Sequence, residues 1–267
     1  MRRLGQHFLS DPKILGRIAD ALDPRPGETV IEIGPGRGSL TAILLDRGLK
    51  VMAIEKDRRL ITELHAKRGT GNVNVVGGDA LKIDWHQLIA PTFPVSRVPF
   101  PVFKIVGNIP YYITSPLLEK ALTPPLPERV VFLVQAEVAD RLAAPPGTKT
   151  YGALSVGVQA LCRVEKLFHI APGAFRPPPK VRSAVVRLTP LAEPLIEPEE
   201  VAPFRKFVTA CFSRRRKQLR NVIAGVTGLP LARVADDLRA LGLDAAARPE
   251  ILPPHAFVRL LRWSLQL

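Results

Sequence analysis

The chain has 267 residues, of which 46% are hydrophobic and 23% charged, so a disordered or collagen-like chain is excluded. Its formal net charge of +14 makes a polyanion the expected kind of partner. Cys162 and Cys211 form no CxxC pair, so we expect neither a disulfide framework nor a cysteine metal site, and we expect a reducing compartment, the cytoplasm. The longest apolar runs, such as residues 130–134, fall far short of the roughly 20 residues of a membrane helix.

Strand and helix patterns alternate from residue 12 to about residue 165. Asp11 is the predicted cap of a first helix, whose apolar side chains share one face. Buried strands are predicted over residues 29–33, 50–54, 73–76, 102–106 and 129–134. Helices are predicted to begin near residues 40, 57 and 115. This rhythm predicts an α/β fold with a Rossmann-like, mostly parallel central sheet covered on both faces, and the β-rich run 181–188 can close one edge.

The composition changes between residues 190 and 203, where four prolines alternate with four glutamates. Such a stretch is typical of a linker or domain boundary. Beyond it, helices are predicted over residues 204–212, 217–226, 231–241 and 255–265. We therefore expect a Rossmann-like domain over residues 1–192 and a small all-helical domain over residues 193–267.

A glycine-rich turn, Glu-Ile-Gly-Pro-Gly-Arg-Gly, follows the first predicted strand. Gly34, Gly36 and Gly38 permit a tight turn and let a ligand approach the backbone closely. A dinucleotide fingerprint would need glycine at position 39, which is Ser39. A nucleoside ligand without phosphates therefore fits better than a pyrophosphate.

Two acids follow the next two predicted strands. Glu55 stands 21 residues after Gly34, where an acid can take the ribose hydroxyls of a nucleoside. Asp79, beside Ala80, can accept a hydrogen bond from an adenine amine. The alternative is that the glycines merely turn the chain and the acids merely cap helices. Three such features at successive strand ends favour a nucleoside-containing ligand in the crevice of an open sheet.

The fourth predicted strand runs into a Gly-Asn-Ile-Pro-Tyr-Tyr loop. The exocyclic amine of adenine is a poor nucleophile because its lone pair is delocalised into the ring. The carbonyls of the Asn108 side chain and the Ile109 main chain can accept both amine hydrogens and push the nitrogen toward tetrahedral geometry. Pro110 stiffens the loop, and Tyr111 offers a ring for stacking an extruded base. The alternative is a proline turn with an aromatic plug.

A run of basic residues without any acid lies between residues 205 and 220. Its members are Arg205, Lys206, Arg214, Arg215, Arg216, Lys217 and Arg220. In a helix, Arg214, Lys217 and Asn221 would share one face, and Arg216 and Arg220 would share another. The alternative is a solvated helix face, but the lack of acids and the net charge favour contact with RNA phosphates.

Phe175 stands in an extended, proline-rich stretch. Its ring can sandwich the target base opposite Tyr111, or it can be a core phenylalanine, and the sequence leaves both open. The histidines at positions 65, 86, 169 and 255 have no HxxxH spacing, so we predict no metal site.

Together these residues resemble class I S-adenosylmethionine-dependent methyltransferases, and more narrowly the small-subunit rRNA adenine dimethyltransferase family (KsgA/RsmA). The resemblance covers nearly the whole chain. It is carried by residues 4–9, 32–38, 108–111, 175–188 and 212–221, of which the last two stretches are highly specific. His7 is a departure, since many members carry asparagine there, although a histidine can also donate to the methionine carboxylate.

The resemblance implies S-adenosyl-L-methionine as the cofactor. The implied cofactor contacts are His7, Leu9, Gly34, Gly36, Glu55, Asp79, Ala80 and Asn108. The implied catalytic residues are Asn108, Ile109, Pro110, Tyr111 and Phe175. The implied RNA-binding residues are Arg214, Arg215, Arg216, Lys217 and Arg220.

The implied reaction converts two adjacent adenosines, in a hairpin near the 3′ end of 16S rRNA, to N6,N6-dimethyladenosine. The expected partner is this rRNA in the small ribosomal subunit or its precursor, and the expected enzyme is a monomer. A large-subunit adenine methylase that confers antibiotic resistance and a DNA adenine methylase are alternatives, against which the last two stretches argue. A ribosome-assembly factor with residual catalysis is a third alternative, against which the intact loop at residues 108–111 argues.

Overall fold

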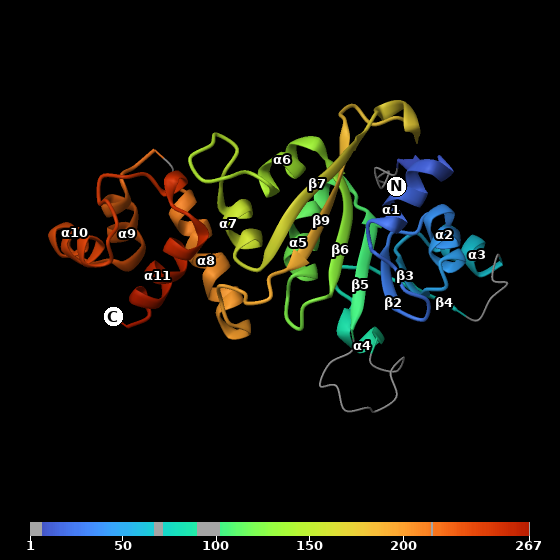
Figure 1. The fold of residues 1–267 in the computed structure, drawn as a ribbon, viewed down its shortest axis with the longest axis horizontal. Coiled ribbons are helices and arrows are strands. Elements are labelled where there is room, and N and C mark those ends of the chain that lie inside the picture. Colours follow the sequence, from blue (N-terminus) through green and yellow to red (C-terminus); the bar gives the residue numbers. More distant parts are fainter. Residues whose placement is uncertain (1–6, 67–71, 90–101, 215, 267) are drawn as a thin grey trace. The chain divides into compact units, whose positions relative to one another are not determined.

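The computed structural model describes residues 7–66, 72–89, 102–214 and 216–266 (Figure 1). The chain divides into two compact units. The first comprises Met1–Ala139 and Glu165–Pro190, and the second comprises Asp140–Val164 and Leu191–Leu267. The predicted division at residues 192 and 193 differs from these units in the segment 140–164, which groups with the C-terminal helices.

A mostly parallel sheet of seven strands is the centre of the fold, as predicted. Its strand order is β4-β3-β2-β5-β6-β9-β7. The strands are β4 (Val73–Gly77), β3 (Lys50–Glu55), β2 (Thr29–Ile33), β5 (Phe103–Asn108), β6 (Arg129–Gln135), β9 (Ser183–Pro190) and β7 (Cys162–Ile170). The first five are parallel, and β9 runs antiparallel to β6.

The predicted place of the run 181–188 at the sheet edge is wrong. It forms β9, but β7 lies beyond it. The sequence did not indicate β7, because this half-exposed strand carries charged side chains without a clean alternation of apolar and polar residues.

Helices flank the sheet, and Figure 1 shows its strands between α5 on one side and α1 and α2 on the other. The helices of this part of the chain are α1 (Pro12–Asp20), α2 (Ser39–Asp46), α3 (Arg58–Ala66), α4 (Trp85–Ile89), α5 (Thr114–Ala121) and α6 (Ala136–Leu142). The predicted cap is confirmed, because the Asp11 carboxylate accepts from the backbone N–H groups of Lys13 and Ile14.

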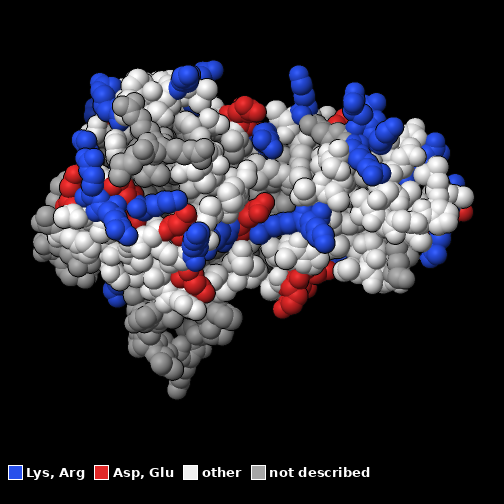
Figure 2. Space-filling model, turned by 180° about the vertical axis from the view of Figure 1, so that it is seen from behind, with Lys and Arg blue, Asp and Glu red and all other residues white. Residues whose placement is uncertain are grey.

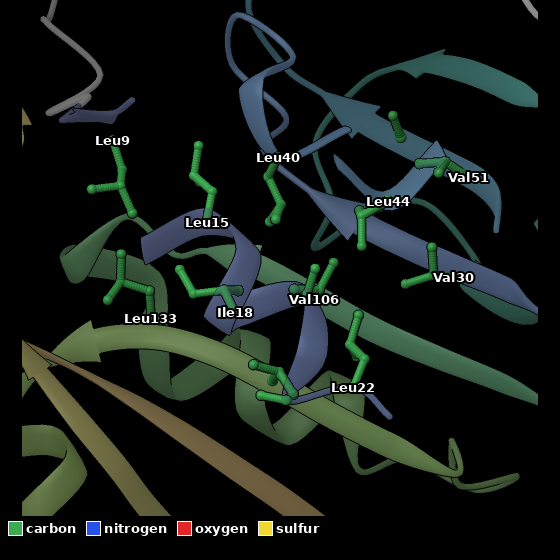
Figure 3. Close-up of a cluster of buried hydrophobic side chains, with 14 of the residues drawn as sticks. Leu9, Leu15, Ile18, Leu22, Val30, Leu40, Leu44, Val51, Val106 and Leu133 are labelled. Atoms are coloured by element: carbon green, nitrogen blue, oxygen red, sulfur yellow. The ribbon is translucent and has the colours of Figure 1, made fainter. Parts of the chain in front are cut away.

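A hydrophobic cluster joins α1 and α2 to one face of the sheet (Figure 3). Alternate strand residues such as Val30 and Val106 point into it, because successive side chains of a strand lie on opposite faces. Leu15, Ile18 and Leu44 meet them from the helices. Every residue of β2 is buried, as expected for a strand covered on both faces. The carboxyl ends of the parallel strands are thereby held at one edge.

A separate ribbon of two short strands joins distant parts of the chain. In it, β1 (Phe8–Leu9) runs antiparallel to β8 (Phe175–Arg176), with Phe8 opposite Arg176 and Leu9 opposite Phe175. The ribbon carries the residues next to His7 and Pro177, both of which reach the site described below.

The second unit is helical, as predicted. Its helices are α7 (Ala153–Gln159), α8 (Val201–Phe212), α9 (Leu219–Thr227), α10 (Leu231–Ala240) and α11 (Pro254–Ser264). The segment 140–164 belongs here because α7 packs on α8 and the Tyr151 hydroxyl donates to the Leu252 carbonyl at 2.8 Å.

Short 3-10 turns occur in both units, at Tyr111–Ile113, Pro172–Ala174, Pro198–Glu200 and Pro249–Ile251. Within the described chain, no helix has both the length and the apolarity to cross a membrane.

Candidate active site

A cavity of about 550 Å³ opens at the carboxyl ends of β2, β3, β4 and β5. This size is typical of small-molecule sites. All eight residues predicted to contact a cofactor line it, namely His7, Leu9, Gly34, Gly36, Glu55, Asp79, Ala80 and Asn108. Ile109, Pro110 and Tyr111 of the predicted catalytic loop line it as well. The structure thus brings together, in one cavity, residues that are up to about a hundred positions apart.

The glycine turn gives the cavity a wall of bare backbone. Gly34 and Gly36 have φ values of +68° and +60°, which other residues rarely adopt. A Cβ atom on Gly36 would also stand 3.1 Å from the ring of Phe8. Glycine is therefore favoured at position 36 both by its backbone conformation and by the close approach of β1.

Glu32 is a buried acid in the cavity lining, to which the sequence alone assigned no role. Its side chain is 1% exposed, and the Thr41 hydroxyl donates to Oε2 at 2.6 Å. Burial raises the pKa of Glu32 to about 7, and the charge of Glu55 adds to the rise while Thr41 opposes it. A cationic group bound beside it would stabilise the ionised form.

Glu55, at the end of β3, is held by three backbone donors. Its Oε1 accepts from the N–H groups of Lys56 and Asp57, each at 2.8 Å, and its Oε2 accepts from Gly36 at 3.1 Å. Burial raises the pKa of Glu55, and these hydrogen bonds oppose the rise. Oε2, which accepts one of the three, keeps a lone pair for a ligand hydroxyl.

Asp79 stands after β4 as an ion-paired acid. Its Oδ1 accepts from Leu81 N at 3.0 Å, and Lys56 Nζ lies 2.8 Å from Oδ2. The hydrogen bond from Lys56 lowers the pKa of Asp79, so the carboxylate is ionised at neutral pH. Its oxygens are fixed hydrogen-bond acceptors at the cavity wall.

His7 fixes the side chain of Asn108. The Asn108 Nδ2 donates to the His7 carbonyl at 2.8 Å, and because a carbonyl only accepts, the amide oxygen is left for another donor. The neighbouring residue, Ile109, is anchored to β6 by a hydrogen bond from its N–H to the Leu133 carbonyl at 3.1 Å. The loop therefore presents a preoriented carbonyl oxygen from Asn108.

Tyr111 is held from two sides. The His7 imidazole stacks on its ring with centroids 5.9 Å apart, while His7 Nδ1 donates to the Pro177 carbonyl at 2.8 Å. A hydrogen bond of 2.7 Å joins the hydroxyls of Tyr111 and Ser183. Burial raises the pKa of Tyr111, which stays neutral. The ring orientation is therefore fixed before any ligand binds.

Known proteins are similar to this chain in sequence and in fold. The family model described as "Ribosomal RNA adenine dimethylase" matches residues 1–236. The chain is 41% identical to "Ribosomal RNA small subunit methyltransferase A" of Hahella chejuensis, over 97% of this chain and 90% of that one. It is 42% identical to the protein of the same name from Pseudomonas aeruginosa, over 100% and 95%.

The chain belongs to the ribosomal RNA adenine dimethylase family. Solved structures agree with this assignment. A dimethyladenosine transferase from Plasmodium falciparum is similar with a TM-score of 0.79 and 29% identity, over 97% of this chain and 98% of that one. The 23S rRNA methyltransferase ErmE is similar with a TM-score of 0.71 and 31% identity, over 97% and 100%. This protein is therefore an rRNA-modifying methyltransferase with an RNA substrate and a methyl donor.

Of the two roles that the sequence left open for Phe175 of this dimethylase, the structure shows that of a core phenylalanine and does not support base stacking. Its side chain is 0% exposed, lies in the hydrophobic cluster beneath the ribbon β1–β8, and is not part of the cavity lining. The extended proline-rich backbone did not keep the ring in solvent, because pairing with Leu9 turns it into the core.

The basic segment, residues 214–220, follows α8 and includes the first residues of α9 in the dimethylase. Arg214, Arg216, Lys217 and Arg220 are all exposed, whereas Arg215 lies outside the described residues. The shared helical faces predicted for them are wrong, because α8 ends at Phe212 and α9 begins at Leu219. Figure 2 shows one face of the surface, on which Lys and Arg side chains are more frequent than Asp and Glu.

The sequence alone missed several polar residues of the site. Glu32, Lys56, Thr41, Tyr112 and Ser183 were assigned no role. The signal for Glu32 was an acid inside a buried strand, since a carboxylate is rarely buried without a partner. Ser183 gave no local signal, because its approach to Tyr111 depends on the pairing of β6 with β9.

Proposed function

We propose that this dimethylase transfers methyl groups from S-adenosylmethionine to the N6 amines of two adjacent adenosines near the 3′ end of 16S rRNA. The product is N6,N6-dimethyladenosine, made by a monomer on the small subunit or its precursor in the cytoplasm. The names of the bacterial relatives support the small subunit as the substrate. The observation that carries the chemistry is the fixed orientation of Asn108, whose amide oxygen is left to accept from an amine.

The residues of the cavity fit this cofactor by their chemistry. Glu32 offers a buried carboxyl to an ammonium group, Glu55 a lone pair to a ribose hydroxyl, and Asp79 an ionised acceptor to an adenine amine. The bare backbone at Gly34 and Gly36 lets a ligand lie against the turn. When bound, the cofactor supplies an electrophilic methyl carbon.

The loop at residues 108–111 orients the target amine. Asn108 Oδ1 and the Ile109 carbonyl accept its two hydrogens, which concentrates the lone pair on nitrogen instead of in the ring. No strong base is needed, because the amine proton becomes acidic as transfer begins. Positioning and fixed dipoles therefore supply the rate. Tyr111, which is covered by His7 on one face, offers its other face to an extruded adenine.

The basic segment supports the binding of a large polyanion. Four exposed cations within seven residues, with no acid among them, suit RNA phosphates spaced along a backbone. We assign Arg214, Arg215, Arg216, Lys217 and Arg220 to this contact.

One experiment tests substrate and product together. Labelled S-adenosylmethionine is offered with unmethylated small subunits, large subunits, naked rRNA and DNA, and product nucleosides are separated. We expect N6,N6-dimethyladenosine in small subunits, with transfer by Asn108→Ala slowed by about 10²–10³. Labelling of large subunits or DNA instead would overturn the proposed substrate, and tight subunit binding without any transfer would favour an assembly factor.

A further inference from the structure

We propose that Tyr112 is a stacking platform for the nucleotide beside the target adenosine, and so a further substrate-binding residue. The inference rests on the proposed function, which it deepens. It assigns a role to an aromatic side chain that neither the cofactor site nor the amine-orienting loop uses.

Tyr112 is an exposed ring on a rigid turn at the rim of the cavity. Its side chain lines the cavity but is 64% exposed, whereas Tyr111, one residue earlier, is half-buried. The 3-10 turn that carries it is closed by a hydrogen bond from Ile113 N to the Pro110 carbonyl at 3.1 Å. The Thr114 hydroxyl donates to the Tyr111 carbonyl at 3.2 Å. An aromatic face held in water beside the site is what a base needs for stacking.

The charges of the cavity lining to which this ring belongs favour a nucleotide over a purely apolar group. Arg37, Lys56 and Arg176 line the same cavity with exposed side chains. Among the described lining residues, the acid that is not buried is Asp79, which pairs with Lys56. Arg176 Nη1 donates to two backbone carbonyls, which hold it in place without neutralising its charge. Cations and an exposed aromatic ring in one lining are the combination that binds single-stranded nucleic acid.

The base that would stack on Tyr112 follows from the number of target adenosines in the proposed reaction. In the proposed reaction two adenosines are adjacent, so one base stays outside while the other occupies the cavity. Tyr111 already carries His7 on one face and is tied to Ser183 by its hydroxyl, and Phe175 is buried. Among the described residues of the lining, Tyr112 is thus the exposed aromatic side chain, and we assign the outer base to it.

The test separates the contribution of the Tyr112 ring from that of its hydroxyl and from that of side-chain volume. Tyr112→Phe keeps the ring, Tyr112→Leu keeps apolar volume without a flat face, and Tyr112→Ala removes both. Leu265→Ala is the matched control, because Leu265 is also 64% exposed but lies outside the cavity lining. Each variant is assayed for KM and kcat on unmethylated small subunits and for S-adenosylmethionine affinity by calorimetry. A second readout is the fluorescence of a hairpin RNA with 2-aminopurine in place of the outer adenosine, which stacking quenches.

We expect the Leu and Ala variants to raise KM roughly 5- to 150-fold, the range for losing one base stacked on an aromatic ring. The KM values of Tyr112→Phe and of the Leu265→Ala control should stay within about twofold of wild type, in line with surface substitutions in general. Quenching should persist with Phe and vanish with Leu, while cofactor affinity is unchanged in all variants. Unchanged KM and quenching in Tyr112→Leu would overturn the platform. If wild type methylates no small subunits, the proposed function fails, but ring-dependent quenching still decides the platform.

Discussion

The cavity of the first unit and the basic segment of the second unit hold their polar side chains in opposite ways. In the cavity, Asn108, Tyr111 and Glu55 each have named hydrogen-bond partners within the protein. In the basic segment, the four described cations are exposed, three of them between α8 and α9 and Arg220 in the first turn of α9. The polar side chains of the cavity are held in place before a ligand arrives, whereas those of the basic segment present positive charge to solvent.

The difference matches what each region must do. Orienting an amine requires an acceptor fixed in position, because the gain comes from dipoles that need no reorganisation during the reaction. Holding RNA phosphates requires positive charge near the RNA backbone. Released counterions supply much of the binding free energy, whatever the side-chain geometry. Substitutions in the two regions should therefore differ in kind as well as in size.

The largest effect is expected at Asn108. Asn108→Ala removes the preoriented acceptor, and losing one such group costs about 10²–10³ in rate. Affinity for small subunits should stay near wild type, and circular dichroism should show an intact fold. Single-turnover methylation of small subunits measures the effect, and near-normal turnover would mean that Asn108 does not orient the amine.

Glu32 should make stability fall as pH rises. The folded pKa of about 7 exceeds the ordinary 4.5, so the folded state holds the proton more tightly, and this contribution is complete below pH 4.5. It is lost as pH rises toward 7, which amounts to roughly 3 kcal/mol of unfolding free energy.

Urea unfolding of the ligand-free protein at pH 5 and pH 8 measures this loss. Glu32→Gln, which can still accept from Thr41, should remove most of the difference between the two pH values. If both proteins lose stability equally, another group is responsible. The buried carboxyl of Glu32 would then not be the group whose ionisation destabilises the folded protein.

Removing the charges of the basic segment should weaken RNA binding without altering the cavity. The quadruple alanine variant of Arg214, Arg215, Arg216 and Lys217 should bind small subunits on the order of 10²-fold more weakly at physiological salt, if each cation binds one phosphate. The slope of log K against log salt should fall by about 0.7–0.9 for each phosphate that the variant no longer neutralises.

Titrations at several salt concentrations measure that slope, and calorimetry checks that cofactor affinity is retained. A solvated surface would leave the slope unchanged. Neutralising the equally exposed Arg233 and Arg239 of α10 provides a control with ion pairs to Asp237 and Asp236.

The sequence predicted features whose signal is local. The five parallel strands, the glycine turn and the loop at residues 108–111 each lie within a few consecutive residues, so periodicity and turn chemistry indicate them. It could not predict β7, whose partner β9 begins more than ten residues later, and it could not decide whether Phe175 is buried. Both depend on pairing between distant segments, which no local pattern encodes. The same holds for Ser183, which meets Tyr111 across 72 positions.

The smallest effect is expected at Ser183, the partner of the Tyr111 hydroxyl. Ser183 is fully buried, and Ser183→Ala removes one neutral hydrogen bond of about 1 kcal/mol, so kcat should fall roughly fivefold. Tyr111→Phe removes the same bond from the other side and keeps the ring. Because both act through one bond, the double variant should lose little more than either single variant, and cofactor affinity should stay constant. Single-turnover rates for the four proteins give the coupling between the two residues. If the two losses simply add, Ser183 does not hold Tyr111, and the orientation of the ring rests on His7 alone.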